Sequence, residues 1–122
     1  MNQQVVPMLH VPDLPRTIAF YESIGFRREE TYEDECEITF AIVRFGGSIV
    51  MLNGGGHEAE RDRRDVDLYV YTDPDELYLR LKDKVEIVAD LNDTFYGNRE
   101  FAIRDINGFW ITFGMPISDR QR

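Results

Sequence analysis

Apolar and polar residues are arranged along the chain so that they predict the same series of elements twice. In the first half, an apolar run from Val5 to Val11 precedes a stretch in which apolar residues recur at helical spacing. Alternating apolar positions, typical of strands, then follow. The segment 66–71 alternates in the same way, and a helical pattern that includes Leu77 and Leu81 comes after it. Each half is therefore expected to fold as β-α-β-β-β.

Both predicted helices begin with an aspartate that is followed closely by proline. Asp13 and Asp73 are suited to accept hydrogen bonds from the first amide groups of a helix. Pro15 and Pro74 lie in the first turn, where the missing N–H group costs nothing, and Gly25 ends the first helix. The predicted strands are 5–11, 26–32, 38–44, 48–53, 66–71, 85–89, 101–104 and 109–113, with the acidic stretch after Tyr32 and the segment 90–98 as loops.

The two predicted hairpins near the end of each half are similar in sequence. The segment Ala41–Leu52 returns 61 positions later as Ala102–Phe113, with a tight turn at Gly47 or Gly108. A single repeat at this period indicates two copies of one supersecondary unit. The stretch between them lacks periodicity and is expected to be flexible. The predicted organisation is one domain, 1–122, with a first module at about 1–53, a connector at 54–65 and a second module at about 66–116.

Size and composition predict one compact domain. The chain has 122 residues, of which 43% are hydrophobic and 30% charged, a balance typical of globular domains. No apolar run approaches the roughly 20 residues that a membrane-spanning helix needs, and no basic segment followed by an apolar one stands at the N-terminus. We therefore expect a cytoplasmic protein with no membrane partner, and Cys36 as the single cysteine excludes an internal disulfide.

The net charge is −9, from 23 acidic and 14 basic residues. A surface this acidic disfavours nucleic acid as a partner, because the phosphate backbone attracts lysine and arginine. It favours a cationic ligand, because the summed charge of a protein steers association. The alternative is that the acidic surface only keeps the protein dissolved, and composition does not decide between the two.

Three segments resemble a known superfamily. Asp13–Phe26 resembles the first helix of the vicinal oxygen chelate superfamily, which includes glyoxalase I, extradiol dioxygenases and bleomycin-resistance proteins. Tyr96–Gly108 and Asp75–Tyr78 are more similar to the bleomycin-resistance branch. The resemblance implies an α+β fold in which two βαβββ modules form a concave mixed sheet backed by helices. It also implies a homodimer, often with exchanged N-terminal elements, and ligand sites in the concavity or at the dimer crevice.

The resemblance also implies four positions for a metal. Metal-using members carry His or Glu on the first and last strand of each module, where these side chains suit a divalent cation. The matching positions in this chain are Val6, Met51, Val66 and Thr112. None of these residue types is a competent ligand for such an ion, so the sequence predicts no metal, no cofactor and no catalytic residue of the usual kind.

Other potential ligands do not replace the missing set. The chain has two histidines, His10 and His57, and each is expected to be a surface or capping residue. Cys36 has no second thiol beside it. Glyoxalase or dioxygenase chemistry by the usual route is therefore not expected.

Aromatic and acidic residues together indicate a binding surface. Tyr32 opens an acidic stretch that includes Asp34, and Trp110 shares a strand face with Thr112 by period two. By resemblance, Tyr96 occupies the place where bleomycin-binding relatives carry a stacking aromatic. An apolar floor with an acidic rim suits a flat, cationic ligand. The predicted ligand-binding residues are Tyr32, Asp34, Phe40, Met51, Leu68, Tyr96, Trp110 and Thr112.

The leading hypothesis is a metal-free, homodimeric binding protein that sequesters a cationic or planar compound, such as a bleomycin-type antibiotic, without chemical change. One alternative is an enzyme of the same fold, a lyase, isomerase or dioxygenase-like protein, with a relocated or absent metal site. Another is an immunity or regulatory module that binds a protein. For Phe40 and Trp110, an ordinary place in the core is an equal alternative to a role in binding.

Overall fold

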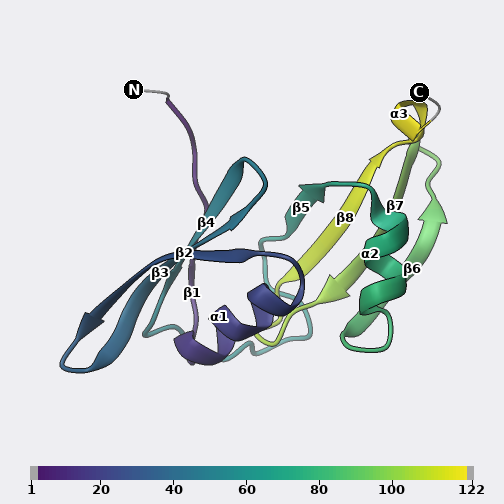
Figure 1. The fold of residues 1–122 in the computed structure, drawn as a ribbon. Coiled ribbons are helices and arrows are strands. Elements are labelled where there is room, and N and C mark those ends of the chain that lie inside the picture. Colours follow the sequence, from purple (N-terminus) through teal and green to yellow (C-terminus); the bar gives the residue numbers. More distant parts are fainter. Residues whose placement is uncertain (1–2, 121–122) are drawn as a thin grey trace. The chain divides into compact units, whose positions relative to one another are not determined.

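The computed structural model describes residues 3–120 of the chain. Contacts divide the chain into two compact units, the first unit at 1–58 and the second unit at 59–122. Each unit contains a helix packed on its own four-stranded sheet (Figure 1).

Within its described residues, the first unit follows the predicted β-α-β-β-β order. Its strands are arranged β1-β4-β3-β2, with β1 parallel to β4 and the other neighbours antiparallel. Its elements are β1 (Met8–His10), α1 (Leu14–Ser23), β2 (Arg27–Asp34), β3 (Glu37–Phe45) and β4 (Ser48–Asn53).

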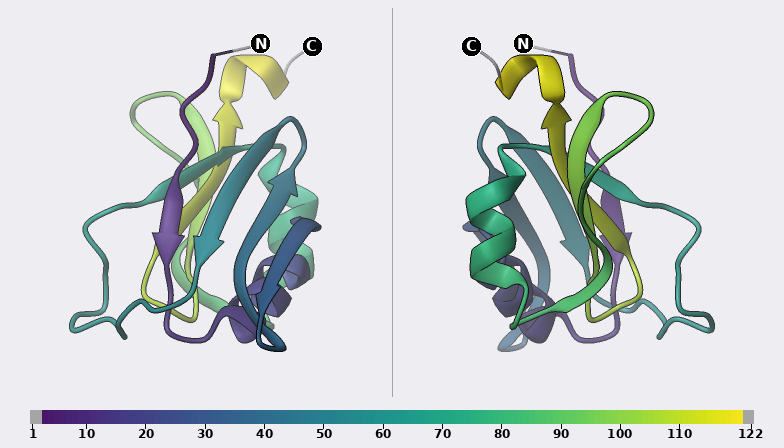
Figure 2. Two further views of the ribbon diagram at one scale, coloured as in Figure 1. Left: turned by 90° about the vertical axis from the view of Figure 1, so that its left-hand side faces the viewer. Right: turned by 90° about the vertical axis from the view of Figure 1, so that its right-hand side faces the viewer.

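The second unit repeats this arrangement with the order β5-β8-β7-β6, and β8 lies between β5 and β7 (Figure 2). The pair β5 and β8 is parallel, as the pair β1 and β4 is. The predicted α+β fold of two βαβββ modules is thus confirmed, although the short last helix was not predicted. The elements are β5 (Leu68–Tyr71), α2 (Pro74–Leu81), β6 (Glu86–Asp93), β7 (Asn98–Arg104), β8 (Trp110–Pro116) and α3 (Ile117–Arg120).

The helix starts agree with the sequence pattern. Asp13 Oδ1 accepts a hydrogen bond from Arg16 N at 3.1 Å, and Asp73 Oδ1 accepts one from Asp75 N at 3.1 Å. Proline lies at one of the first two positions of each helix. These bonds satisfy amide groups that the helix itself leaves without a partner.

Each helix covers one face of its sheet and leaves the other face without a helix of its own unit. On the covered face of the first unit, Ile18 and Tyr21 are fully buried, as are Val43 and Leu52 of the sheet. In the second unit, Leu81 is buried, and the stacked rings of Phe101 and Phe113 lie 5.3 Å apart. We call the opposite side of each sheet its open face.

The first residues of two segments that we predicted as loops belong to strands. Strand β2 runs on to Asp34, which pairs with Glu37, and β6 runs on to Asp93, which pairs with Arg99. The loop before β7 is correspondingly short. The prediction failed because both strands lie at sheet edges and are mainly polar, so their residues show little alternation of apolar and polar positions.

The connector expected to be flexible is held by backbone hydrogen bonds on both sides. Gly56 N donates to Val11 O at 3.1 Å in the first unit, and Arg64 N donates to Gly108 O at 2.8 Å in the second. Each end of the connector is thus bonded to its own unit. Composition alone does not reveal these bonds, because backbone groups of any residue type can make them.

The turn between β2 and β3 carries backbone strain that substitution is expected to relieve. Glu35 and Cys36 have φ angles of 49° and 70°, in the left-handed region that residues with a Cβ atom avoid. A two-residue turn of this kind favours Asn-Gly. The double substitution Glu35→Asn and Cys36→Gly is expected to raise the free energy of unfolding by about 1 kcal/mol. Thermal unfolding measures the gain, and Cys36→Ser, which keeps the Cβ atom, should give little or none of it.

Candidate functional site

The open face of the second sheet brings polar and aromatic side chains together. Along β8, Ile111 and Phe113 are buried, so Thr112 and Gly114 point to the open face. Strand pairing places Tyr69 of β5 beside Thr112 and Glu100 of β7 beside Gly114. Side chains from β5 and β7, the two neighbours of β8, therefore meet over β8.

One carboxylate is the centre of the group. Tyr69 Oη donates a hydrogen bond to Glu100 Oε2 at 2.8 Å, and Tyr96 Oη donates to Glu100 Oε1. Asn98 Nδ2 donates to Tyr69 Oη at 3.0 Å, which orients that phenol. We call Tyr69, Tyr96, Asn98 and Glu100 the Glu100 cluster.

A glycine makes this cluster possible. A Cβ atom on Gly114 would lie 2.6 Å from Tyr69 Oη, 2.6 Å from Glu100 Cβ and 2.9 Å from the backbone oxygen of Arg99. Those distances are far inside van der Waals contact. Only a residue without a side chain lets the tyrosine of β5 cross β8 and reach the carboxylate on β7.

Exposed aromatic rings surround the cluster. The rings of Tyr69 and Tyr71 lie 4.8 Å apart, and those of Phe95 and Tyr96 lie 5.1 Å apart. Phe95 is 100% exposed, Tyr71 73% and Tyr96 56%. Several solvent-exposed aromatic rings so close together, beside a carboxylate, can stack on a flat ligand and attract a cation.

At the other end of β8, Trp110 is covered by the segment that precedes β5. The guanidinium group of Arg63 lies 4.0 Å from the centre of the Trp110 ring. Trp110 Nε1 donates to Asp62 O at 3.3 Å, and Arg104 Nε donates to the same oxygen at 2.7 Å. The half-buried Trp110 is therefore partly covered by arginine, where we had expected it to form an uncovered apolar floor.

Four of the predicted binding residues lie in the first unit. Tyr32 and Phe40 pair directly across β2 and β3, with ring centres 5.6 Å apart, on the open face of the first sheet. Met51 lies on that face as well, beside Met8 of β1. Asp34 is exposed at the end of β2.

One predicted residue is on the wrong face. Leu68 pairs with Ile111, which is buried on the covered side of the second sheet. Leu68 therefore points away from Thr112 and the Glu100 cluster. The error arose because the alternation in 66–71 has no marker of which set faces the helix, and a shift by one residue exchanges the two faces.

A family model of the Glyoxalase/Bleomycin resistance protein/Dioxygenase superfamily matches residues 3–113. The chain belongs to this superfamily. Curated protein sequences give no match.

Solved structures of this superfamily fold match nearly the whole chain. TioX from Micromonospora sp. ML1 is 23% identical, with a TM-score of 0.77 over 94% of this chain and 99% of TioX. The bleomycin-binding protein from bleomycin-producing Streptomyces verticillus, complexed with copper(II)-bleomycin, is 27% identical, with a TM-score of 0.67 over 93% and 95%. The fosfomycin resistance protein FosX from Listeria monocytogenes is 16% identical, with a TM-score of 0.76 over 100% and 99%. A bleomycin-binding protein and a fosfomycin resistance protein thus share this fold.

In the structure, Val6 and Val66, which we matched by sequence to superfamily metal positions, are not the strand partners of Met51 and Thr112. The residue that pairs with Met51 is Met8, and the residue that pairs with Thr112 is Tyr69, so Val6 and Val66 precede β1 and β5. Met8 and Tyr69 are 61 positions apart, as Met51 and Thr112 are, which is the interval of the repeat that begins at Ala41. Within residues 3–120, no group of three or more His, Cys, Asp or Glu side chains is placed to hold a metal ion.

Sequence reasoning missed most of the Glu100 cluster. Tyr69, Asn98 and Glu100 were not among the predicted binding residues, although Glu100 lies in the segment that resembles the bleomycin-resistance branch. The repeat at 61 positions was the available signal, because it makes Tyr69 the counterpart of Met8.

No helix in the described residues is long and apolar enough to cross a membrane.

The phenols of the cluster hold their protons tightly. Burial and, to a smaller extent, the hydrogen bond to Glu100 together raise the pKa of Tyr69 to about 12. The hydrogen bond to the same carboxylate is the main reason that the pKa of Tyr96 is raised. Both phenols therefore remain hydrogen-bond donors above the pH at which tyrosine ordinarily ionises.

This shift predicts a loss of stability at high pH. Because the pKa of Tyr69 is higher in the folded protein than in the unfolded chain, its contribution is complete below about pH 10 and is lost as the pH rises through 12. Thermal unfolding over this range should show a smaller pH dependence for Tyr69→Phe than for the unsubstituted protein. The substitution Tyr71→Phe on the neighbouring ring is the control, and an equal effect of the two would contradict the assignment.

Proposed function

We propose that this protein binds a planar, positively charged small molecule on the open face of the second sheet and leaves it chemically unchanged. The observation that carries the proposal is the Glu100 cluster, in which one carboxylate lies among exposed aromatic rings. Superfamily membership and the 27% identical bleomycin-binding neighbour support the same class of ligand.

The cluster offers two kinds of attraction to such a ligand. The rings of Tyr71 and Phe95 project into water, and covering them with a flat aromatic group removes apolar surface from solvent. A carboxylate that accepts one hydrogen bond on each oxygen still has lone pairs for a cation, since each oxygen has two. The net charge of −9 adds a general attraction for cations.

A bleomycin-type antibiotic is the ligand we propose to test first. The neighbour from Streptomyces verticillus was solved with copper(II)-bleomycin, so both the metal-free and the copper-loaded compound are suitable probes. We further propose that the protein acts as a homodimer, as the superfamily resemblance implies, and that it works in the cytoplasm, as expected from the lack of a long apolar run in the sequence.

Calorimetric titration with both forms of bleomycin tests the proposal. Glu100→Gln removes the charge and is expected to weaken binding about tenfold or more, because a charge-assisted hydrogen bond contributes about 1.5–3 kcal/mol. Asp90→Asn is the matched control, since Asp90 also accepts a tyrosine hydrogen bond, from Tyr78 at 2.9 Å. It should leave the affinity unchanged.

Two outcomes would count against this site. If neither form of bleomycin binds at high micromolar concentration, the specific ligand is wrong. If Glu100→Gln and Asp90→Asn weaken binding equally, the ligand responds only to overall charge, and the Glu100 cluster is not its site.

An enzymatic role is the second candidate, because a carboxylate between two phenols is also a set of groups that can exchange protons. Mass spectrometry of the recovered ligand distinguishes the two roles, since a binding protein returns it unchanged. Elemental analysis of untagged protein is the second measurement. Stoichiometric zinc, nickel, iron or manganese would support an enzyme with a relocated metal site.

A further inference from the structure

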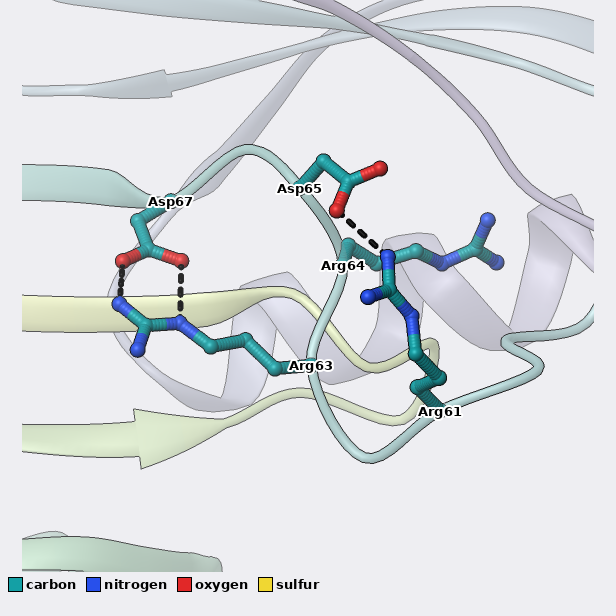
Figure 3. A pocket seen from close by; sticks show the side chains of 5 residues that line it. All are labelled: Arg61, Arg63, Arg64, Asp65 and Asp67. Atoms are coloured by element: carbon teal, nitrogen blue, oxygen red, sulfur yellow. Dashed lines mark hydrogen bonds and ion pairs between the residues drawn. The ribbon is translucent and has the colours of Figure 1, made fainter.

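Arginine is concentrated in the segment that leads into β5. Arg61, Arg63 and Arg64 occupy three of four consecutive positions, in a chain whose net charge is −9. With Asp65 and Asp67 they line an open pocket of about 430 Å³ (Figure 3). Three positive and two negative side chains leave a net charge of +1 at this pocket, against the sign of the whole protein.

The backbone of this segment is fixed against the turn between β7 and β8. Arg64 N donates to Gly108 O at 2.8 Å, and Arg64 Nε donates to Asn107 O at 2.8 Å. Asp62 O accepts hydrogen bonds from the Arg104 and Trp110 side chains. The pocket wall is therefore formed before any ligand arrives, which lowers the entropy cost of binding.

The two ion pairs of the pocket differ in strength. Arg63 binds both oxygens of Asp67 through Nε and Nη2 and is stacked on Trp110, so its position is defined. Within residues 3–120, its Nη1 group remains for a further acceptor. Among the described residues, the Arg61 side chain has one ion-pair partner, with Nη2 2.6 Å from Asp65 Oδ1, and these side chains are 70% and 86% exposed. An ion pair so exposed contributes little, about 0–1 kcal/mol.

Figure 3 shows the pairs on opposite sides of the loop, with the Arg64 guanidinium directed away from both. An incoming anion that displaces Asp65 from Arg61 costs little, because the released carboxylate is already largely in water. Once Asp65 has left, the planar guanidinium group of Arg61 suits an oxygen anion, since its N–H groups match carboxylate and phosphate geometry.

We propose that the pocket formed by Arg61, Arg63, Arg64, Asp65 and Asp67 is a binding site for an oxyanion, a carboxylate or a phosphate. In the absence of the anion, Asp65 forms an ion pair with Arg61, and the anion takes the place of Asp65 when it binds. The site is separate from the Glu100 cluster and does not depend on the function proposed for that cluster.

The single tryptophan of the chain makes the site directly observable, because Trp110 is stacked on Arg63. Inorganic phosphate and citrate are titrated separately at constant ionic strength, with sodium chloride as the reference salt. Tryptophan fluorescence and calorimetry are recorded in parallel. We expect a saturable response with a dissociation constant on the order of 1 mM, and the tighter-binding anion identifies the class of ligand.

Two substitutions should change the affinity in opposite directions. Arg61→Gln is expected to weaken binding at least about fivefold, whereas Asp65→Asn should strengthen it severalfold by removing the competing carboxylate. Arg80→Gln, at an exposed arginine of α2, is the control for charge alone and should have no effect. Thermal unfolding of each variant verifies that it is folded.

The proposal is overturned if neither anion gives a saturable response beyond that of sodium chloride. It is also overturned if Asp65→Asn weakens binding as Arg61→Gln does, since the pair would then be only a structural contact within the loop. No cationic ligand enters this experiment, so its failure is distinguishable from failure of bleomycin binding.

Discussion

Replacing Gly56 by alanine is expected to destabilise the protein by about 3 kcal/mol. A Cβ atom on Gly56 would lie 2.3 Å from the carbonyl carbon of His10, 2.4 Å from its oxygen and 2.5 Å from Val11 N. All three atoms belong to the backbone, so no side-chain rotation relieves the clash. The hydrogen bond from Gly56 N to Val11 O would have to lengthen or break as the two segments separate. Thermal and denaturant unfolding measure the loss.

A neighbouring glycine provides the control. A Cβ atom on Gly54 would lie 3.8 Å from Thr39 O, which is an ordinary van der Waals contact. Gly54→Ala is therefore expected to leave the unfolding midpoint nearly unchanged. Equal midpoints for Gly54→Ala and Gly56→Ala would show that the segment is as loose as its composition suggested.

Replacing Gly114 by alanine is expected to cost about 1–3 kcal/mol and to take the Glu100 cluster apart. The new methyl group would lie 2.6 Å from Tyr69 Oη and from Glu100 Cβ, so the phenol and the carboxylate must separate. The pKa of Tyr69, which burial and Glu100 raise to about 12, should then fall towards its ordinary value. Absorbance titration of the tyrosines measures that fall, and unfolding measures the stability.

A double substitution tests whether the hydroxyl group of Tyr69 is the obstacle. In Gly114→Ala with Tyr69→Phe, one of the close contacts is gone, so the double variant should lose less stability than the sum of the single ones. Additive losses would place the strain instead at the two contacts that remain, Glu100 Cβ at 2.6 Å and the backbone oxygen of Arg99 at 2.9 Å from the added carbon.

Local signals allowed much of the fold to be predicted from the sequence. The helix starts at Asp13 and Asp73 were correct because a cap and a proline act within one turn of the chain. The hairpin turn at Gly108, where φ is 89°, was predictable because a glycine tolerates that angle. The hairpin sequence that returns after 61 positions then predicted that the two units have similar structures.

The candidate site was harder to predict because it depends on strand register. Glu100 meets Tyr69 only because β7 and β5 both pair with β8, at Gly114 and Thr112. A sequence shows which residues alternate, but it does not show how far one strand slides along another. Leu68 was misplaced, and Glu100 overlooked, for this one reason.

The covering of Trp110 could not be predicted for a different reason. Arg63 and Trp110 are 47 positions apart, and the segment that carries Arg63 has no apolar pattern of its own. Its position follows from backbone bonds, such as that between Arg64 N and Gly108 O, which any residue types can make.

The polar edge strands, parts of which we had predicted as loops, affect how the chain behaves while it folds. In each sheet, the antiparallel edge strand carries many charges and two breaks in register, between Arg28 and Glu30 in β2 and between Ile87 and Ala89 in β6, among others. The opposite edges, β1 and β5, are only 3 and 4 residues long. Short, charged or bulged edges are poor templates for an added strand. Both copies of the repeat are thus protected against edge-to-edge aggregation, the hazard that an exposed sheet edge creates at high protein concentration.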